Sequence, residues 1–138
     1  GELKHGRILG PERSATQIEL AQTDCRNIGI KAPVRSSGDT KGTPGVTLRG
    51  PNGTLTVPEG VMIADRHIHM TPAQAAAFGL ADGDRVQVKI DGPKPGVMGG
   101  VLIRANDKCA LDFHIDTDDG NAFLLKQGQL VTVLGKEE

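Results

Sequence analysis

The chain has 138 residues and a formal net charge of −1, and 37% of its residues are hydrophobic. This length fits one domain or two small ones. The balanced charge offers no basic surface for nucleic acid or for an anionic membrane. No apolar run approaches the roughly 20 residues that span a bilayer, and no signal-peptide pattern opens the sequence. We therefore expect a cytoplasmic protein that binds neither nucleic acid nor a membrane.

The residue types favour a small, turn-rich β fold. Three Phe with neither Trp nor Tyr leave a core of Val, Ile and Leu, while 19 Gly and 8 Pro are spread along the chain. Such a composition indicates tight turns between short strands, as in small β-barrels. The two cysteines, Cys25 and Cys109, lie far apart and form no CxxC motif. We expect reduced, partly buried thiols, and no residue near either one in the sequence indicates an activated thiolate.

The hydrophobic pattern predicts short strands separated by turn-forming residues. In chain order, the predicted strands cover residues 6–9, 16–20, 46–49, 54–57, 61–68, 85–90, 101–104, 110–115 and 130–134. Two short helices are predicted between them. The first covers residues 22–27 and is followed by Gly29. The second has Thr71 as its N-cap, Pro72 as its first helical residue and Gly79 at its C-terminal end.

These two helices belong to an internal repeat with a constant offset, in which Gln17 aligns with His67, Glu19 with His69 and Gly29 with Gly79. Each copy is a strand ending in a polar-apolar-polar-apolar tetrad, followed by a short helix, a glycine and an aliphatic residue. Two copies are too few for a solenoid. We therefore predict a mainly β fold of two small β-barrels with short capping helices.

The tetrads contain candidate metal ligands. His67 and His69 are separated by one apolar residue in a predicted strand, so both imidazoles point to the same face. His114 lies in a second alternating segment, residues 111–118. Zinc accepts neutral imidazole nitrogens, usually in tetrahedral sites. With Glu19, which is equivalent to His69 in the repeat, these residues predict a zinc site of three histidines and a carboxylate.

Two other groups of polar residues lie near these motifs. Arg13 follows the turn at residues 10–11 and precedes the strand that carries Glu19. Its planar guanidinium suits phosphate oxygens, with a solvated surface position as the alternative. Asp116 and Asp118 are expected to be turn and cap residues.

Several segments match the PduL phosphotransacylase family in order and spacing, across almost the whole chain. They cover residues 7–11, 16–19, 33–39, 66–70 and 114–118, with Asn121 and Ala122. The chain thus resembles this family, whose members consist of two β-barrels capped by short helices. The resemblance implies two zinc ions at a cleft and conversion of acyl-CoA and phosphate into acyl phosphate and CoA. Propanoyl-CoA is the best-known substrate of the family.

The resemblance also implies roles for individual residues. It makes His67, His69 and His114 the ligands of one zinc ion. It makes Glu19 a carboxylate that reaches both zinc ions, and Arg13 the residue that binds phosphate.

Three further residues fall where the family contacts coenzyme A: Ser37, Ala64 and Lys94. Lys94 departs from the family pattern, because an arginine is expected at this position. An exposed turn lysine between Pro93 and Pro95 is the alternative interpretation.

The family has a further His-x-His motif upstream, on strands that complete the first barrel, and this sequence begins after that motif. We therefore expect residues 1–64 to form a partial first β-barrel with Arg13 and Glu19, incomplete in this chain. Residues 65–138 are expected to form the second β-barrel with the histidines. The unpaired edges of the first barrel call for a partner. That partner would be an N-terminal segment, a second chain, or other copies in a homo-oligomer.

The expected mechanism is direct attack of phosphate on the thioester, polarised by zinc and oriented by Arg13. Two alternatives remain open from the sequence: a zinc-dependent hydrolase, and a non-catalytic barrel with structural zinc. Whether added phosphate is converted into acyl phosphate distinguishes the acyltransferase from both alternatives. Packaging of the protein in a bacterial microcompartment also remains open.

Overall fold

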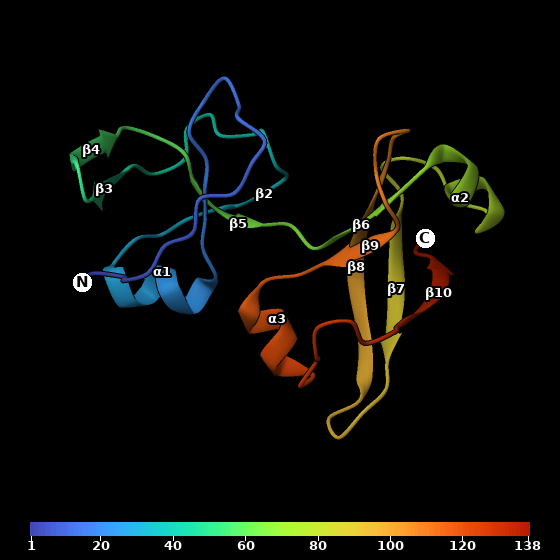
Figure 1. The fold of residues 1–138 in the computed structure, drawn as a ribbon. Coiled ribbons are helices and arrows are strands. Elements are labelled where there is room, and N and C mark those ends of the chain that lie inside the picture. The colour runs from blue at the N-terminus through green and yellow to red at the C-terminus, as the bar shows by residue number, and fades with distance from the viewer. The chain divides into compact units, whose positions relative to one another are not determined.

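A computed structural model describes residues 1–138, which divide into two compact units, Gly1–Ala64 (unit 1) and Asp65–Glu138 (unit 2). Strands outweigh helices in both units (Figure 1), so the predicted mainly-β class is confirmed. The sheets contain three, five and two strands, and none of them closes on itself. The two predicted small barrels are therefore not confirmed. No helix has the length and apolarity needed to cross a membrane.

Unit 1 is built from a small parallel sheet, a hairpin and a helix. Its elements are β1 (Ile18–Glu19), α1 (Gln22–Ile28), β2 (Val34–Arg35), β3 (Val46–Gly50), β4 (Gly53–Val57) and β5 (Val61–Ala64). Strand β5 lies between β1 and β2 and runs parallel to both, whereas β3 and β4 form an antiparallel hairpin. Cys25, Val61 and Met62 are fully buried. The core of unit 1 therefore involves α1 and β5.

Two strand predictions in unit 1 need correction. Residues 6–9 form no strand, and Ile8 and Leu9 are 103% and 76% exposed. Their apolar character predicts a strand, but no strand pairs with them, and a strand needs a hydrogen-bonding neighbour. Strand β2 is absent from the prediction, because two residues are too few to show a periodic pattern.

Unit 2 contains one five-stranded sheet and two short helices. Its elements are β6 (His67–Met70), α2 (Pro72–Ala77), β7 (Arg85–Ile90), β8 (Gly96–Ala105), β9 (Asp112–His114), α3 (Thr117–Ala122) and β10 (Thr132–Lys136). The strand order is β10-β7-β8-β6-β9. Strands β7 and β8 form a long antiparallel hairpin (Figure 1), while β6 runs parallel to β8 and antiparallel to β9.

Alternating burial builds the core of unit 2. On β7, the side chains of Val86, Val88 and Ile90 are fully buried while the intervening residues are exposed. Val101 and Ile103 of β8 are also fully buried. Burying large aliphatic side chains of this kind stabilises a fold by about 1.5–3 kcal/mol each. The predicted strand 85–90 is confirmed with its predicted bounds.

The predicted strand 61–68 is in fact two strands, β5 followed by β6. They pair with different neighbours: β5 with β1 and β2, and β6 with β8 and β9. Asp65 and Arg66 lie between the two strands, and their side chains form ion pairs with Arg85 and Asp119, respectively. The apolar residues on both sides of Asp65 and Arg66 predict a single strand, but the chain passes from one sheet to another at these two polar residues.

Both predicted helices are present, and a glycine with left-handed backbone conformation lies within two residues of the end of each. The Thr71 side chain accepts a hydrogen bond from Gln74 N at 3.2 Å at the start of α2, and Gly79 follows the helix with φ of 70°. Helix α1 ends at Gly29, with φ of 79°. Helix α3 is absent from the prediction, although its N-cap, Asp116, was expected to have a capping role.

The internal repeat extends to the backbone hydrogen bonds of α1 and α2. Two bonds recur at the offset of the repeat: Cys25 N to Ala21 O and Ile30 N to Cys25 O in the first copy, and Ala75 N to Thr71 O and Leu80 N to Ala75 O in the second. The caps differ, because Ala21 stands where α2 has Thr71, and α1 has no side-chain cap. The repeated unit is therefore a short strand followed by a helix, rather than a barrel.

Candidate metal centre

Strands β6 and β9 bring three imidazoles to one face of the five-stranded sheet. On β6, Ile68 is 3% exposed, which places the side chains of His67 and His69 on the opposite face. In the antiparallel register, His67 lies directly opposite His114, and Ile68 lies opposite Phe113. The predicted convergence of the three histidines is therefore present in unit 2.

The three rings lie edge to face. Their centroids are 4.7 Å apart for His67 and His69, 5.1 Å for His67 and His114, and 4.7 Å for His69 and His114. One nitrogen of each ring lies within 4.8 Å of the others. Zinc holds imidazole nitrogens at about 2.0–2.1 Å, so two such ligands in a tetrahedral site lie about 3.4 Å apart. A small inward movement closes the cluster to this spacing, so the residues fit a zinc ion.

Hydrogen bonds orient two of the rings. His67 Nδ1 lies 2.7 Å from the backbone oxygen of Asp65, which can only accept, so this nitrogen carries the proton. The lone pair of His67 is then on Nε2, which lies 3.1 Å from Nε2 of His69. On its other side, His69 Nδ1 lies 3.2 Å from Cys109 Sγ. Both rings thus turn Nε2 into the cluster.

The electrostatic environment of His69 favours its neutral form. Burial is the main cause that lowers the pKa of His69, and the nearby His67, His114 and Arg104 lower it further, while Asp112 acts in the opposite direction. A neutral imidazole is the form that binds metal. His67 and His69 are half-buried whereas His114 is exposed, so the cluster is accessible to solvent from one side.

Sequence reasoning missed two residues next to the histidines. Arg104 of β8 lies opposite His69 of β6 in the parallel register. Cys109 Sγ lies 3.2 Å from Nδ1 of His69, a base that is distant from it in the sequence. Neither position carries a local sequence signal, because both depend on how segments distant in the chain pair. Asp112, whose Oδ2 lies 3.0 Å from His114 Nε2, was readable from its alternation with His114.

Arg13 lines an open depression of ≈ 270 Å³ in unit 1. The other lining residues are Ser14, Ala15, Gln17, Gly38 and Thr40. A guanidinium, an amide and hydroxyl groups around a small hollow can bind an anion the size of phosphate.

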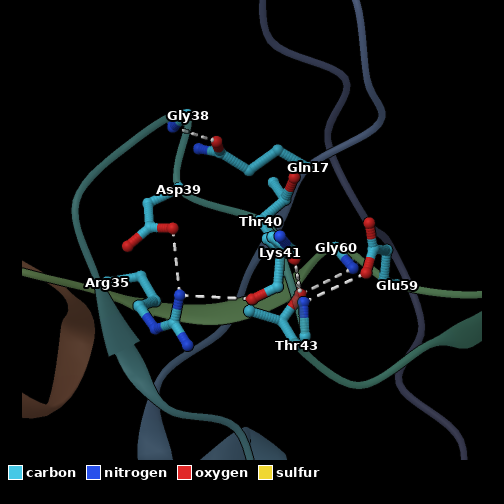
Figure 2. A network of polar contacts seen from close by, with 10 residues as sticks. Gln17, Arg35, Gly38, Asp39, Thr40, Lys41, Thr43, Glu59 and Gly60 are labelled. Atoms are coloured by element: carbon cyan, nitrogen blue, oxygen red, sulfur yellow. Dashed lines mark hydrogen bonds and ion pairs between the residues drawn. The ribbon is translucent and has the colours of Figure 1, made fainter.

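The side chain of Gln17 connects Glu19 to the loop that carries Ser37. Gln17 Nε2 donates to Glu19 Oε1 at 2.6 Å and to Ser37 Oγ at 3.0 Å. Its Oε1 accepts a hydrogen bond from Gly38 N at 2.7 Å (Figure 2). Glu19 itself is exposed at the end of β1. Glu19, a predicted metal ligand, and Ser37, a predicted coenzyme A contact, therefore both bind the side-chain amide of Gln17.

A polar network fixes the loop at residues 36–43, which follows β2 (Figure 2). Arg35 Nη1 donates to Asp39 Oδ1 at 3.0 Å. The buried hydroxyl of Thr43 accepts a hydrogen bond from Gly60 N at 2.8 Å, which ties the far end of the loop to the residue before β5. The loop that contacts Gln17 is thus held at both ends.

The other two predicted coenzyme A contacts occupy a strand end and a turn. Ala64 is the last residue of β5 and pairs with Arg35 of β2. Lys94 is exposed in the turn between β7 and β8. Ala64 belongs to unit 1 with Arg13 and Glu19, whereas Lys94 belongs to unit 2 with the histidines. That these residues act in one active site stays a prediction.

These features define a mainly-β protein with a candidate three-histidine metal centre and a candidate anion site. Comparison with known proteins provides the family: the chain belongs to the phosphate propanoyltransferase family, whose model matches residues 1–126. The resemblance to phosphotransacylases is therefore confirmed.

Several curated proteins named phosphate propanoyltransferase are similar to this chain. The protein of Thermotoga maritima is 45% identical over 135 residues, which cover 97% of this chain and 64% of that protein. The protein of Salmonella typhimurium is 47% identical over 123 residues, 88% of this chain and 59% of that protein. The protein of Shewanella putrefaciens is 47% identical over 135 residues, 97% of this chain and 64% of that protein. The chain thus spans about six tenths of the length of these relatives.

Proposed function

We propose that the protein transfers an acyl group between coenzyme A and inorganic phosphate, converting a short-chain acyl-CoA and phosphate into acyl phosphate and CoA. Membership of the family supports this activity, and the names of the relatives make propanoyl the first acyl group to test. The observation that carries the proposal is the convergence of three imidazoles on β6 and β9 in a chain of this family.

Zinc is the proposed resident metal, held by His67, His69 and His114. Three nitrogen donors suit zinc better than magnesium or calcium, which prefer oxygen ligands. Zinc in catalytic sites can expand to five ligands, so a substrate oxygen could bind it beside the three histidines and a carboxylate. When bound, the ion supplies Lewis-acid polarisation of a thioester carbonyl or a phosphate oxygen. Glu19 is the proposed carboxylate ligand, because the repeat places it at the position of His69.

Arg13 is the proposed phosphate-binding residue. Its guanidinium can donate two parallel hydrogen bonds to phosphate oxygens, which fixes both the position and the direction of the nucleophile. Gln17 lines the same depression and has both of its amide atoms committed to Glu19, Ser37 and Gly38. A phosphate bound there would contact side chains that are already held in place. Such preorganisation lowers the activation barrier of the transfer by orienting the phosphate.

The proposed reaction is a direct transfer. A phosphate oxygen attacks the carbonyl carbon of the thioester, a carbon–oxygen bond forms, and the carbon–sulfur bond breaks. The bonding electron pair leaves with the sulfur of CoA, and a thiolate needs no strong general acid to depart. Direct transfer uses no thiol of the protein, and Cys25 is fully buried. Cys109, beside His69, is the thiol that a covalent route would have to use.

Coenzyme A is the proposed ligand of Ser37, Ala64 and Lys94. Ser37 lies on the loop held by Gln17, Ala64 ends β5, and Lys94 presents an exposed ammonium group in a turn. A cation there suits the phosphate groups of CoA. Substitution of Lys94 by Ala should raise the Michaelis constant for acyl-CoA more than that for phosphate.

A further β segment is proposed to complete unit 1, in the same polypeptide, in another chain, or in another copy of this one. The three-stranded sheet of unit 1 has open edges, and the side chains of Ile8 and Leu9 have no apolar cover. Closed barrels would require such added strands. Both cysteines are free thiols, which agrees with a reducing compartment such as the cytoplasm.

The test is to measure CoA release and acyl phosphate formation from propanoyl-CoA in parallel. The chain is assayed alone and mixed with the part of the Thermotoga maritima relative that lies outside the matched region, each metal-free and zinc-loaded. Equal yields of CoA and acyl phosphate that need both phosphate and zinc are expected. Release of CoA without phosphate would identify a hydrolase and overturn the proposal.

Two variants sharpen this test. His69→Ala should abolish acyl phosphate formation, whereas His5→Ala, outside the cluster, should retain it. Cys109→Ser keeps a polar group beside His69 but removes the thiol, so direct transfer predicts retained activity. A loss of acyl transfer with retained zinc binding in Cys109→Ser would support a covalent route instead.

A further inference from the structure

Arg85 lies outside the histidine cluster but is linked to it through Asp65. Arg85 Nη2 donates to Asp65 Oδ2 at 2.7 Å, and Arg85 Nη1 donates to the backbone oxygen of Gly100 at 2.8 Å. The backbone oxygen of the same Asp65 accepts the hydrogen bond from His67 Nδ1 at 2.7 Å. One residue thus joins a guanidinium on β7 to a candidate metal ligand on β6.

Several contacts hold this link in one position. The two bonds of Arg85 fix the Asp65 side chain, which is only 16% exposed, against β8. The next residue, Arg66, accepts a backbone hydrogen bond from Leu102 N at 3.0 Å and donates to Asp119 Oδ1 at 2.9 Å. A peptide segment fixed on both sides has little freedom to turn its carbonyl group away from the imidazole.

We propose that Arg85 and Asp65 are a positioning pair for His67. They hold its proton on Nδ1, so that Nε2 presents its lone pair to a metal ion. The inference rests on the proposed metal centre. Histidines that bind metals commonly donate their other N–H to a carbonyl or carboxylate, and loss of such a partner lowers metal affinity about 10–100-fold. Arg85 acts one bond further out, so the expected loss is about tenfold.

The test compares zinc affinity by competition with a chromophoric chelator. Arg85→Met removes both hydrogen bonds of the guanidinium, and Asp65→Asn keeps the backbone carbonyl but weakens the pair. Each change is expected to lower zinc affinity about tenfold, and the double variant no further, because both act through one link. Lys89→Met is the matched control, since Lys89 is an exposed cation on the same strand and pairs only loosely with Asp91, at 3.8 Å.

Nitrogen NMR of the histidine rings in the metal-free protein supplies a second readout, at about pH 8, where imidazoles are neutral. His67 should be protonated on Nδ1 in the wild type and in Lys89→Met, and should become a mixture of tautomers in Arg85→Met. Partly exposed ion pairs contribute little to stability, so the melting temperature should hardly change. If Arg85→Met fails to fold, Arg85→Lys, which can keep one of the two bonds, should show an intermediate loss.

Wild-type zinc affinity and an unchanged His67 tautomer in Arg85→Met would overturn the inference. Additive losses in the double variant would also contradict it, since they would mean that the two residues act separately. A wild-type protein that binds no zinc would overturn the proposed metal centre instead. The tautomer measurement needs no metal, so it still shows whether Arg85 orients His67.

Discussion

Zinc added to the metal-free protein should raise its melting temperature through the cluster of His67, His69 and His114. A ligand present at one hundred times its dissociation constant stabilises the folded state by about 2.7 kcal/mol. For a domain of the size of unit 2, each kcal/mol corresponds to about 4–8 °C. The expected rise is therefore about 10–20 °C. Any zinc bound by the unfolded chain reduces this value.

Single alanine substitutions locate the effect. Each cluster histidine supplies one of three nitrogens within 4.8 Å of one another, so removal of any one leaves only two donors and should abolish most of the rise. His5→Ala removes the one histidine outside the cluster and should leave the rise intact. Thermal unfolding is followed by circular dichroism with and without zinc, at matched protein concentration. An equal rise in all four variants, or none in the wild type, would refute the reasoning.

Three further predictions concern α2, Asp119 and Arg13. Thr71→Ala removes the capping box of α2 and should cost about 1 kcal/mol in chemical unfolding, whereas Thr71→Ser should cost less. Burial raises the pKa of Asp119, so the folded chain holds this proton more tightly than the unfolded chain. Its contribution to stability should fall as pH rises from about 3.9 through the raised value, and a pH-independent difference between wild type and Asp119→Asn would contradict this. Arg13→Ala should raise the Michaelis constant for phosphate with little effect on CoA affinity, and Arg13→Lys should rescue only part of the loss.

Local alternation made part of the fold and the metal cluster predictable. Val86, Val88 and Ile90 are buried on one face of β7, and this regularity is visible in the sequence. The same reasoning places His67 and His69 on the polar face of β6. The spacing within a strand fixes which side chains point together, so these predictions need no knowledge of the neighbouring strands.

Features that depend on pairing could not be predicted in this way. Leu9 has strand-forming neighbours in sequence but no partner strand, and it remains exposed. Cys109 reaches His69 only because the chain returns to the end of β6 after β8, which sequence spacing does not reveal. The polar residues Asp65 and Arg66 interrupt an apolar stretch too briefly to mark a strand end. Such features are set by contacts between segments distant in the chain.

The two copies of the repeated strand–helix unit share backbone hydrogen bonds but carry different side chains at the equivalent position of the strand. Equivalent hydrogen bonds build α1 and α2, yet the strand before the first presents Glu19 and the strand before the second presents His69. One local scaffold therefore presents an oxygen-bearing side chain in one copy and a nitrogen-bearing side chain in the other. The unit can therefore be treated as a module, and we expect Glu19→His and His69→Glu to leave the backbone hydrogen bonds of the following helix unchanged.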